Sequence, residues 1–199
     1  MHDLPQDLEA RLRAGEPRAL DDLFAHVRPR LEKVVALRMD GALRGRLDPQ
    51  DVLQEAWLDV ARRFPDWVAK PDMPPFLWVR FLTVQKLLEL HRRHGAQQRD
   101  ARREVPLHAG PSASTASVAE HLAGSVSSPS QGAQRNELLA RVHEALEALS
   151  EVDREVLVLR HFEELGNDEV AAILGIGKAG ASNRYVRALK RLRAALEGA

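Results

Sequence analysis

The sequence contains no cysteine among its 199 residues. Disulfide bonds, a thiol nucleophile and a cysteine-ligated zinc site are therefore excluded. Aromatic residues are scarce, at 5% of the chain with a single tyrosine. No apolar run approaches the roughly 20 residues that span a bilayer, and the start of the chain lacks the basic and apolar parts of a secretory signal. We therefore expect a cytoplasmic protein that makes no contact with the membrane.

The sequence also has no excess of charge of either sign, because 29 lysines and arginines balance 29 aspartates and glutamates. A neutral total can still combine an acidic surface with a basic one. Strand patterns of alternating polarity are missing too. Apolar residues instead recur at spacings of three and four almost throughout, which indicates helices. The sequence predicts an all-α protein.

One stretch differs from the rest in composition. Residues 106–134 are rich in Ser, Ala, Gly and Pro and contain no Lys, Arg, Phe, Trp or Tyr. This composition is typical of flexible linkers. We therefore predict two small helical domains, at 1–104 and 136–199, joined by a flexible linker at 105–135.

A helix with an acidic face is predicted from Asp48 to about Arg63. Asp48 suits the N-cap, Pro49 the first helical position, and Asp51 can complete a capping box. The apolar face of this helix consists of Val52, Leu53, Ala56, Trp57 and Val60, and the polar face of Asp51, Gln54, Glu55 and Asp59.

Carboxylates along one helix can bind a metal or act as acids and bases, so a metal-dependent helical enzyme using Asp48, Asp51 and Glu55 is one alternative. No second cluster of acids or histidines completes such a site, and no glycine-rich phosphate loop is present. We therefore predict no catalytic residue, metal site, cofactor or small-molecule substrate.

A proline-containing loop at 64–75 is predicted to precede a helix from Phe76 to about His94. This helix is apolar and aromatic at its start and ends in His91-Arg92-Arg93-His94. Proteins bind single-stranded nucleic acid with such a combination, because bases stack on rings while the backbone follows cations. Arg80, Arg92 and Arg93 are the predicted contacts, whereas Phe81 is expected in the core.

The residues from Asn167 to Arg193 have the pattern of a helix-turn-helix. Asn167 is the expected N-cap of a first helix, and Gly175 ends it because glycine readily adopts positive φ. The second helix is expected to bury residues at three- and four-residue spacing, namely Ala181, Tyr185, Ala188, Leu189 and Leu192.

The second helix carries six cations and no acidic residue between Lys178 and Arg193. Its polar face offers side chains that can bond base edges or meet a thymine methyl, and cations that can meet phosphates. The predicted DNA contacts are Ser182, Asn183, Arg184, Val186, Arg187, Lys190 and Arg191. A basic face that only keeps a bundle helix solvated is the simpler alternative.

In this order, the acidic helix with Asp51, Gln54 and Glu55, the basic helix end, the linker and the helix-turn-helix resemble a bacterial RNA polymerase sigma factor. The resemblance is to the small extracytoplasmic-function (ECF) group of the sigma-70 family. It implies a first domain like sigma region 2 and a second like region 4. The implied partners are core RNA polymerase and promoter DNA, and an anti-sigma protein is a further candidate.

The resemblance also implies roles for the residues. Asp51, Gln54 and Glu55 would bind core polymerase, and the loop 64–75 with the following helix would hold unpaired bases of the −10 element. Ser182, Asn183, Val186 and Arg187 would read the −35 element. A dimeric helix-turn-helix regulator remains an alternative, although it gives the acidic helix no role.

Overall fold

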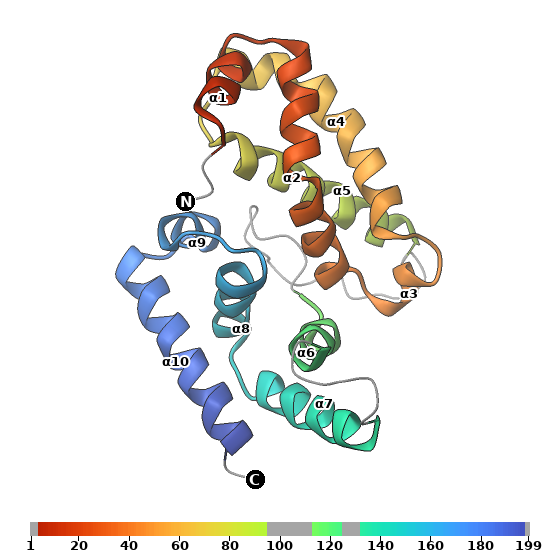
Figure 1. The fold of residues 1–199 in the computed structure, drawn as a ribbon, viewed down its shortest axis with the longest axis vertical. Helices are drawn as coiled ribbons and strands as arrows, with labels where there is room; N and C mark the ends of the chain where they lie inside the picture. Colours follow the sequence, from red (N-terminus) through yellow and green to blue (C-terminus); the bar gives the residue numbers. More distant parts are fainter. Residues whose placement is uncertain (1–3, 95–112, 125–131, 198–199) are drawn as a thin grey trace. The chain divides into compact units, whose positions relative to one another are not determined.

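The computed structural model describes residues 4–94, 113–124 and 132–197, which fold into helices arranged in two units (Figure 1). The first unit is Met1–Pro111 and the second is Ser112–Ala199. No strand occurs within these described ranges, and the predicted all-α class is confirmed.

The first unit is built around helix α4 (Pro49–Ala69), which packs against α2 (Pro17–Arg38) and α5 (Pro75–His94). The shorter helices α1 (Gln6–Arg13) and α3 (Gly41–Arg44) pack on α2 and α5, respectively. The apolar faces meet in a core that includes Leu23, Leu31, Val35, Val52, Ala56, Val60, Val79 and Leu87.

Helix α4 is longer than the sequence predicted. The expected loop at 64–75 begins only at Lys70, because the helix continues through Pro65 to Ala69. Proline removes one helical hydrogen bond, but Phe64 and Trp67 on either side of it are buried and their rings stack at 6.1 Å. Burial of these two aromatic side chains offsets the lost bond, so the predicted boundary at residue 64 is wrong.

The second unit contains α6 (Thr115–Gly124), α7 (Gly132–Glu147), α8 (Glu151–Leu157), a π-helical turn (Val158–Phe162), α9 (Asn167–Leu174) and α10 (Lys178–Glu197). Helix α10 packs against α7, α8 and α9, which fix it within its own unit.

Helix α6 lies inside the segment that was predicted to be a flexible linker. Ser117, Val118 and Ala119 are buried, α6 packs against α7, and Arg154 Nη1 donates to Thr115 Oγ1 over 2.6 Å. The linker prediction is therefore wrong for Thr115–Gly124. Small residues such as alanine favour helices once a partner surface is present, and composition alone does not reveal that surface. The remainder of the predicted linker, at 105–112 and 125–131, lies outside the described residues, as does the end of the predicted first domain.

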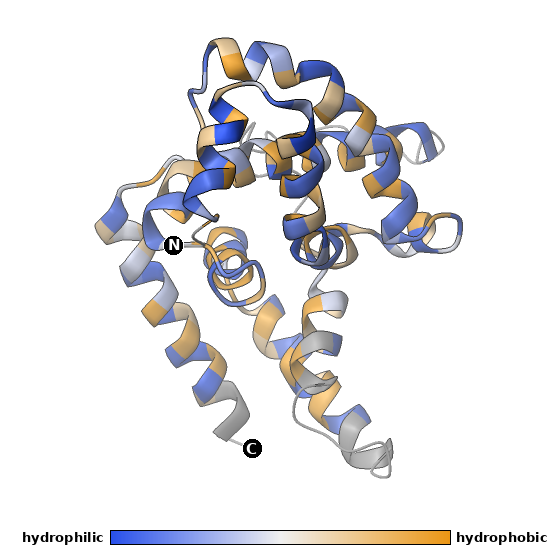
Figure 2. Cartoon of the chain, turned by 45° about the horizontal axis from the view of Figure 1, so that its top comes forward, coloured by the Kyte–Doolittle hydropathy of each residue, from blue (hydrophilic) through white to orange (hydrophobic). Residues whose placement is uncertain are grey.

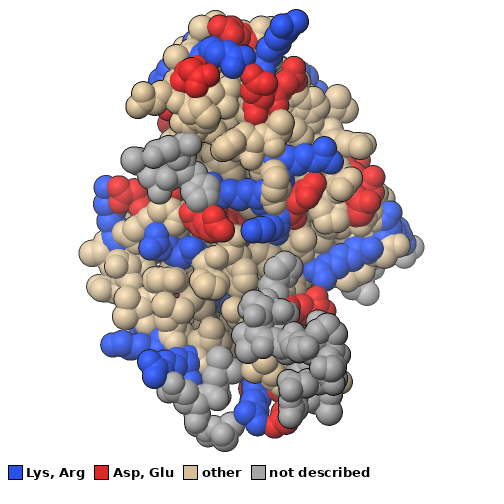
Figure 3. Space-filling view, in the orientation of Figure 1, with Lys and Arg blue, Asp and Glu red and all other residues tan. Residues whose placement is uncertain are grey.

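The surface chemistry follows from amphipathic helices. Figure 2 shows hydrophobic and hydrophilic residues interspersed along each helix, as expected where one face packs and the other is solvated. On the face seen in Figure 3, acidic and basic side chains are intermixed. Within the described ranges, none of the helices combines the length and hydrophobicity needed to cross a membrane.

Candidate functional site

The start of α4 is fixed by the predicted capping box. Asp48 Oδ1 accepts from the backbone N–H groups of Gln50 (2.8 Å) and Asp51 (3.0 Å), and Asp51 Oδ2 accepts from Asp48 N–H (2.9 Å). These bonds satisfy N–H groups that have no partner within the helix. Asp51 therefore already has a structural role, which any interface it forms must share.

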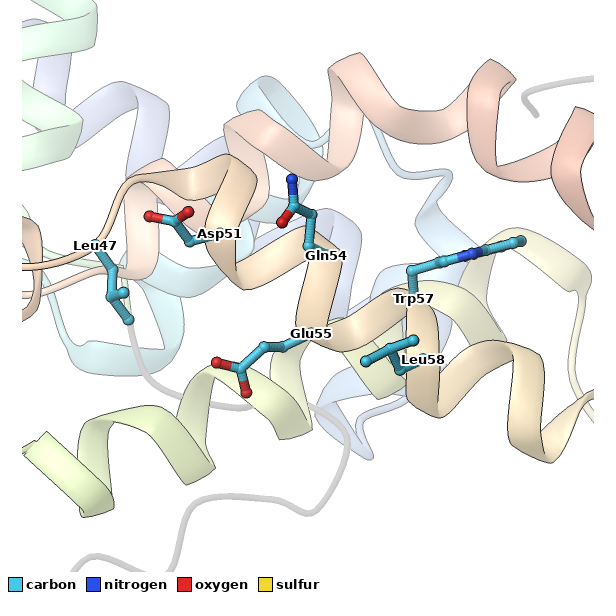
Figure 4. Close-up of a pocket in the computed structure, with 6 residues that line it drawn as sticks. All are labelled: Leu47, Asp51, Gln54, Glu55, Trp57 and Leu58. Atoms are coloured by element: carbon cyan, nitrogen blue, oxygen red, sulfur yellow. The ribbon is translucent and has the colours of Figure 1, made fainter.

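Asp51, Gln54 and Glu55, the three predicted polymerase contacts, line one shallow hollow on α4 (Figure 4). Asp51 and Gln54 are exposed and Glu55 is half-buried. The same hollow includes Leu47, Trp57 and Leu58, and Leu58 is 68% exposed. The α4 hollow, as we call this set, therefore combines carboxylates with an uncovered apolar side chain.

Leu58 was missed by the sequence reasoning, although its spacing could have revealed it. It lies three residues after Glu55 and seven after Asp51, on the polar stripe of an otherwise regular amphipathic helix. Leu58 lies beside two carboxylates, so a partner that covers this hollow would bury apolar area next to charged groups.

The basic end of α5 is only partly as predicted. Arg92 and Arg93 are exposed, but Arg93 pairs with Glu89 and lies 3.8 Å from Glu55 of α4. Arg80 is 1% exposed, because it lies on the buried side of α5. A buried guanidinium cannot reach a DNA phosphate, so the assignment of Arg80 as a DNA contact is wrong.

The aromatic residues near the start of α5 belong to the core. The rings of Trp67 and Trp78 stack at 5.4 Å, and Phe64 completes the group. Trp67 Nε1–H donates to the carbonyl of Met73 over 3.0 Å, which ties the short segment before α5 to the end of α4. Phe81, expected in the core, is half-buried. The ring cluster of Phe64, Trp67 and Trp78 therefore anchors the segment 70–74 through the bond to Met73.

Asp59 and His91 of the first unit have structural partners. Asp59 pairs with Lys86 of α5 (2.8 Å) and with Arg62 (2.6 Å), and the hydrogen bond from Lys86 lowers the pKa of Asp59. His91 Nε2 accepts from Asp40 N–H over 3.4 Å, and burial lowers the pKa of His91. Across the described ranges, no group of three or more His, Asp or Glu residues is placed to share a metal ion.

The helix-turn-helix forms as the pattern predicted, with α9 and α10 as its two helices. Gly175 has φ +63°, the left-handed conformation that ends α9 and that glycine adopts without strain. Asn167 is the first helical residue rather than the cap, since Gly166 precedes the helix. Its Nδ2 donates to the carbonyl of Lys178 over 2.9 Å, which fastens the start of α10 to that of α9.

The outward face of α10 carries most of the predicted DNA contacts. Ser182, Asn183 and Lys190 are exposed, and Val186 is 47% exposed. A groove runs along this face for three turns and is lined by Asn183, Val186, Arg187, Lys190, Arg191 and Ala194. The inward face is narrower than expected: Ala181 and Ala188 are buried, whereas Leu189 is 38% exposed and Tyr185 is half-buried beside Arg160.

Three arginines of α10 converge on one carboxylate that sequence reasoning did not single out. Asp153 of α8 has a side chain only 3% exposed and lies 2.9 Å from Arg184 Nη1, 3.1 Å from Arg187 Nη2 and 3.9 Å from Arg191 Nη1. Burial acts to raise the pKa of Asp153, but hydrogen bonds from Arg184, Arg187 and Ser150 leave that pKa below its ordinary value. Arg184 is thereby turned toward α8 and away from the groove.

Comparison with known proteins bears on both units. Residues 139–192, from α7 into α10, match the family described as Sigma-70, region 4. The chain is 28% identical over 181 residues to the ECF RNA polymerase sigma factor SigD of Mycobacterium tuberculosis, which covers 90% of this chain and 78% of that protein. It is 25% identical over 194 residues to the RNA polymerase sigma-H factor of Pseudomonas aeruginosa, covering 96% and 93%.

Two further likenesses concern one region and the fold. A stretch of 68 residues is 43% identical to the RNA polymerase sigma factor FliA of Yersinia enterocolitica, and it spans 34% of this chain and 30% of FliA. Among solved structures, CnrH in complex with the cytosolic domain of CnrY matches with a TM-score of 0.54 and 24% sequence identity over 96% of both chains. This second likeness is one of fold.

Proposed function

The chain belongs to the extracytoplasmic-function group of the sigma-70 family, whose members are promoter-recognising sigma factors of RNA polymerase, and we propose how its two units share this task. The first unit docks on core polymerase and helps to open the −10 element. The second unit grips the duplex at the −35 element. The family acts by binding rather than by covalent chemistry.

The α4 hollow is the proposed docking site for core polymerase. Its carboxylates at Asp51 and Glu55 would set partner choice and the rate of encounter, since charge complementarity acts chiefly on these quantities. Leu58 would supply apolar contact area at the centre of the interface. A basic, partly apolar surface on the polymerase is the complementary partner.

The basic end of α5 and the segment 70–74 are the proposed −10 contacts. Arg92 is exposed and would meet a phosphate, whereas Arg93 would do so only by sharing its charge with Glu89 and Glu55. The hydrogen bond from Trp67 to the Met73 carbonyl restrains the segment 70–74 before unpaired bases arrive. A preorganised site loses less entropy on binding.

The main support for DNA binding by the second unit is the groove along α10. It lies on the exposed face of the second helix of the helix-turn-helix, and a helix of this size fits the major groove. Asn183 and Arg187 can bond base edges, Val186 can meet a thymine methyl, and Lys190 can meet a phosphate. The recognition helix of this motif lies in the major groove in other DNA-binding proteins.

An anti-sigma protein is a further proposed partner, supported by the family resemblance and by a solved complex of a protein with this fold. The complex of CnrH with the cytosolic domain of CnrY shows that a protein of this fold is bound by another chain. Pull-down from the source organism with the full chain, with and without added core polymerase, tests this point: an inhibitor would be lost when polymerase is in excess.

The proposed function is tested by reconstituting the full chain with core RNA polymerase on genomic DNA. Run-off transcription followed by mapping of 5′ ends should reveal starts that depend on this chain and share two upstream elements. Core polymerase alone is the control. DNA binding by a dimer of the chain without polymerase, and no new starts with it, would instead support the dimeric regulator.

A further inference from the structure

The carboxylate of Asp153 lies next to α10, the helix proposed to read DNA. It lies in the first turn of α8, its side chain is 3% exposed, and its Oδ1 accepts from both Arg184 (2.9 Å) and Arg187 (3.1 Å) of α10. A negative charge this close to DNA opposes binding unless it serves another purpose. The two arginines differ in whether their guanidinium groups can still reach the groove.

Arg184 and Arg187 lie three residues apart, but only one of them borders the groove. Arg184 is turned to α8 and does not line the groove, whereas Arg187 does and is 50% exposed. A guanidinium has five N–H donors in a rigid planar fork. Because Asp153 occupies one edge of that fork, the other donors of Arg187 remain available on the groove side.

We propose that Asp153 is a positioning residue for promoter recognition: it holds the guanidinium of Arg187 in one orientation at the edge of the α10 groove. This inference rests on the proposed binding of α10 to the −35 element. A fixed guanidinium meets a guanine edge with little further loss of side-chain entropy, and a wrong base leaves its donors unpaired. A mobile guanidinium could bind a nearby phosphate instead, and such a contact does not depend on the base sequence.

The same arrangement limits non-specific binding. Asp153 neutralises part of the charge of Arg184, Arg187 and the more distant Arg191. The number of phosphates that these arginines can engage therefore falls. Since non-specific affinity depends on released counterions, the carboxylate shifts the balance from phosphate attraction toward base readout. Asp153 thus lowers the affinity for DNA of any sequence and raises the discrimination between bases of the −35 element.

The test uses holoenzyme assembled from core polymerase and the full chain, on a promoter selected with the parent protein. Binding is measured for the selected −35 element and for each single-base variant, over a series of salt concentrations. Asp153→Asn keeps the shape but removes the charge. We expect about a tenfold loss of discrimination at one base pair, tighter binding to unrelated DNA, and a salt slope steeper by roughly one.

Double variants separate positioning from general damage to the unit. If Asp153 acts through Arg187, adding Asp153→Asn to Arg187→Ala should change discrimination no further, since coupled residues are non-additive. Additive losses would overturn the proposal. Circular dichroism checks the fold. Should Asp153→Asn not fold, Asp153→Glu, which keeps the charge but moves the carboxylate by one methylene, should lower discrimination with an unchanged salt slope.

The outcomes distinguish this inference from the proposed function. If the parent holoenzyme shows no sequence preference at the −35 element, the proposed function of α10 is wrong. A selective parent whose discrimination is retained by both Asp153→Asn and Asp153→Glu would leave that function intact and overturn only the role of Asp153.

Discussion

Arg93 Nη1 lies 3.8 Å from Glu55 Oε2, so a residue assigned to DNA and one assigned to polymerase are neighbours across α4 and α5. Glu89 also pairs with Arg93. The two proposed interfaces of the first unit therefore meet at this point. A change of charge at Glu55 will therefore alter the electrostatic surroundings of Arg93, and a change at Arg93 will alter those of Glu55.

The polymerase interface is best tested at Glu55 and Leu58. Asp51→Lys would also remove the capping bond to Asp48 N–H, which costs about 1 kcal/mol of stability. Glu55→Lys and Leu58→Ala leave this capping bond in place. The titration contains no DNA, so the loss of the Arg93 partner of Glu55 does not enter through DNA binding. Each variant should weaken binding to core polymerase about tenfold, which corresponds to about 1.4 kcal/mol. Fluorescence anisotropy of labelled protein titrated with core polymerase measures it.

The control for this comparison is Asp21→Lys, which makes a similar change of charge on the exposed side of α2, away from the α4 hollow. It should bind core polymerase as the parent does. If Glu55→Lys and Leu58→Ala also bind with parental affinity, the α4 hollow is not the docking site.

Arg92 and Arg93 are expected to differ in their contribution to open-complex formation. Arg92→Ala should reduce the slope of log affinity against log salt concentration by about 0.9, the value for one phosphate contact. Arg93→Ala should change it less, because Glu89 and Glu55 already compensate part of its charge. Filter binding of holoenzyme to promoter DNA over a salt series gives both slopes. Equal slopes for parent and Arg92→Ala would show that Arg92 makes no phosphate contact.

Two neighbours on the α10 groove should separate base readout from phosphate contact. Val186→Ala should reduce the preference for thymine at one position of the −35 element, because the two Cγ methyl groups that would meet the thymine methyl are removed. Lys190→Ala should weaken binding to every sequence by a similar factor. Competition binding with all single-base variants at one salt concentration measures both. A uniform loss with Val186→Ala would show that the register proposed for α10 is wrong.

The stability of the first unit should depend on pH through Asp59. The hydrogen bond from Lys86 lowers the pKa of Asp59 in the folded protein below its unfolded value. The stabilisation is therefore fully present above the unfolded pKa and is lost as pH falls through the lower folded pKa. Asp59→Asn should cost about 1–2 kcal/mol at pH 7, allowing for partial exposure, and progressively less as pH falls below about 3.9.

Tryptophan fluorescence is suited to this measurement, because all three tryptophans, at positions 57, 67 and 78, lie in the first unit. Urea unfolding at pH 7 and at pH 3 gives the two stability differences. Asp66→Asn, at an exposed carboxylate of the same helix, is the control and should change stability little at either pH. A loss for Asp59→Asn that is the same at both pH values would contradict the assigned ion pair.

Local patterns in the sequence predicted the elements that carry the proposed function. The helix-turn-helix follows from apolar spacing and from Gly175, whose positive φ is a property of the residue itself. The start of α4 follows from Asp48, Pro49 and Asp51, which act within a single turn. Such features are determined by residues a few positions apart, so the sequence alone is enough to predict them.

Only the tertiary structure decided which charged side chains remain available. Periodicity placed Arg80 among the basic residues of α5 without showing that neighbouring helices would cover it. Arg184 and Arg187 share similar surroundings in sequence, yet Asp153, 31 and 34 positions away, turns one aside and leaves the other at the groove. Helix α6 likewise formed because α7 offered a surface to pack on. The sequence by itself determined most of the helices and their polar faces, whereas contacts between residues far apart in the chain determined α6 and which of those faces stay open.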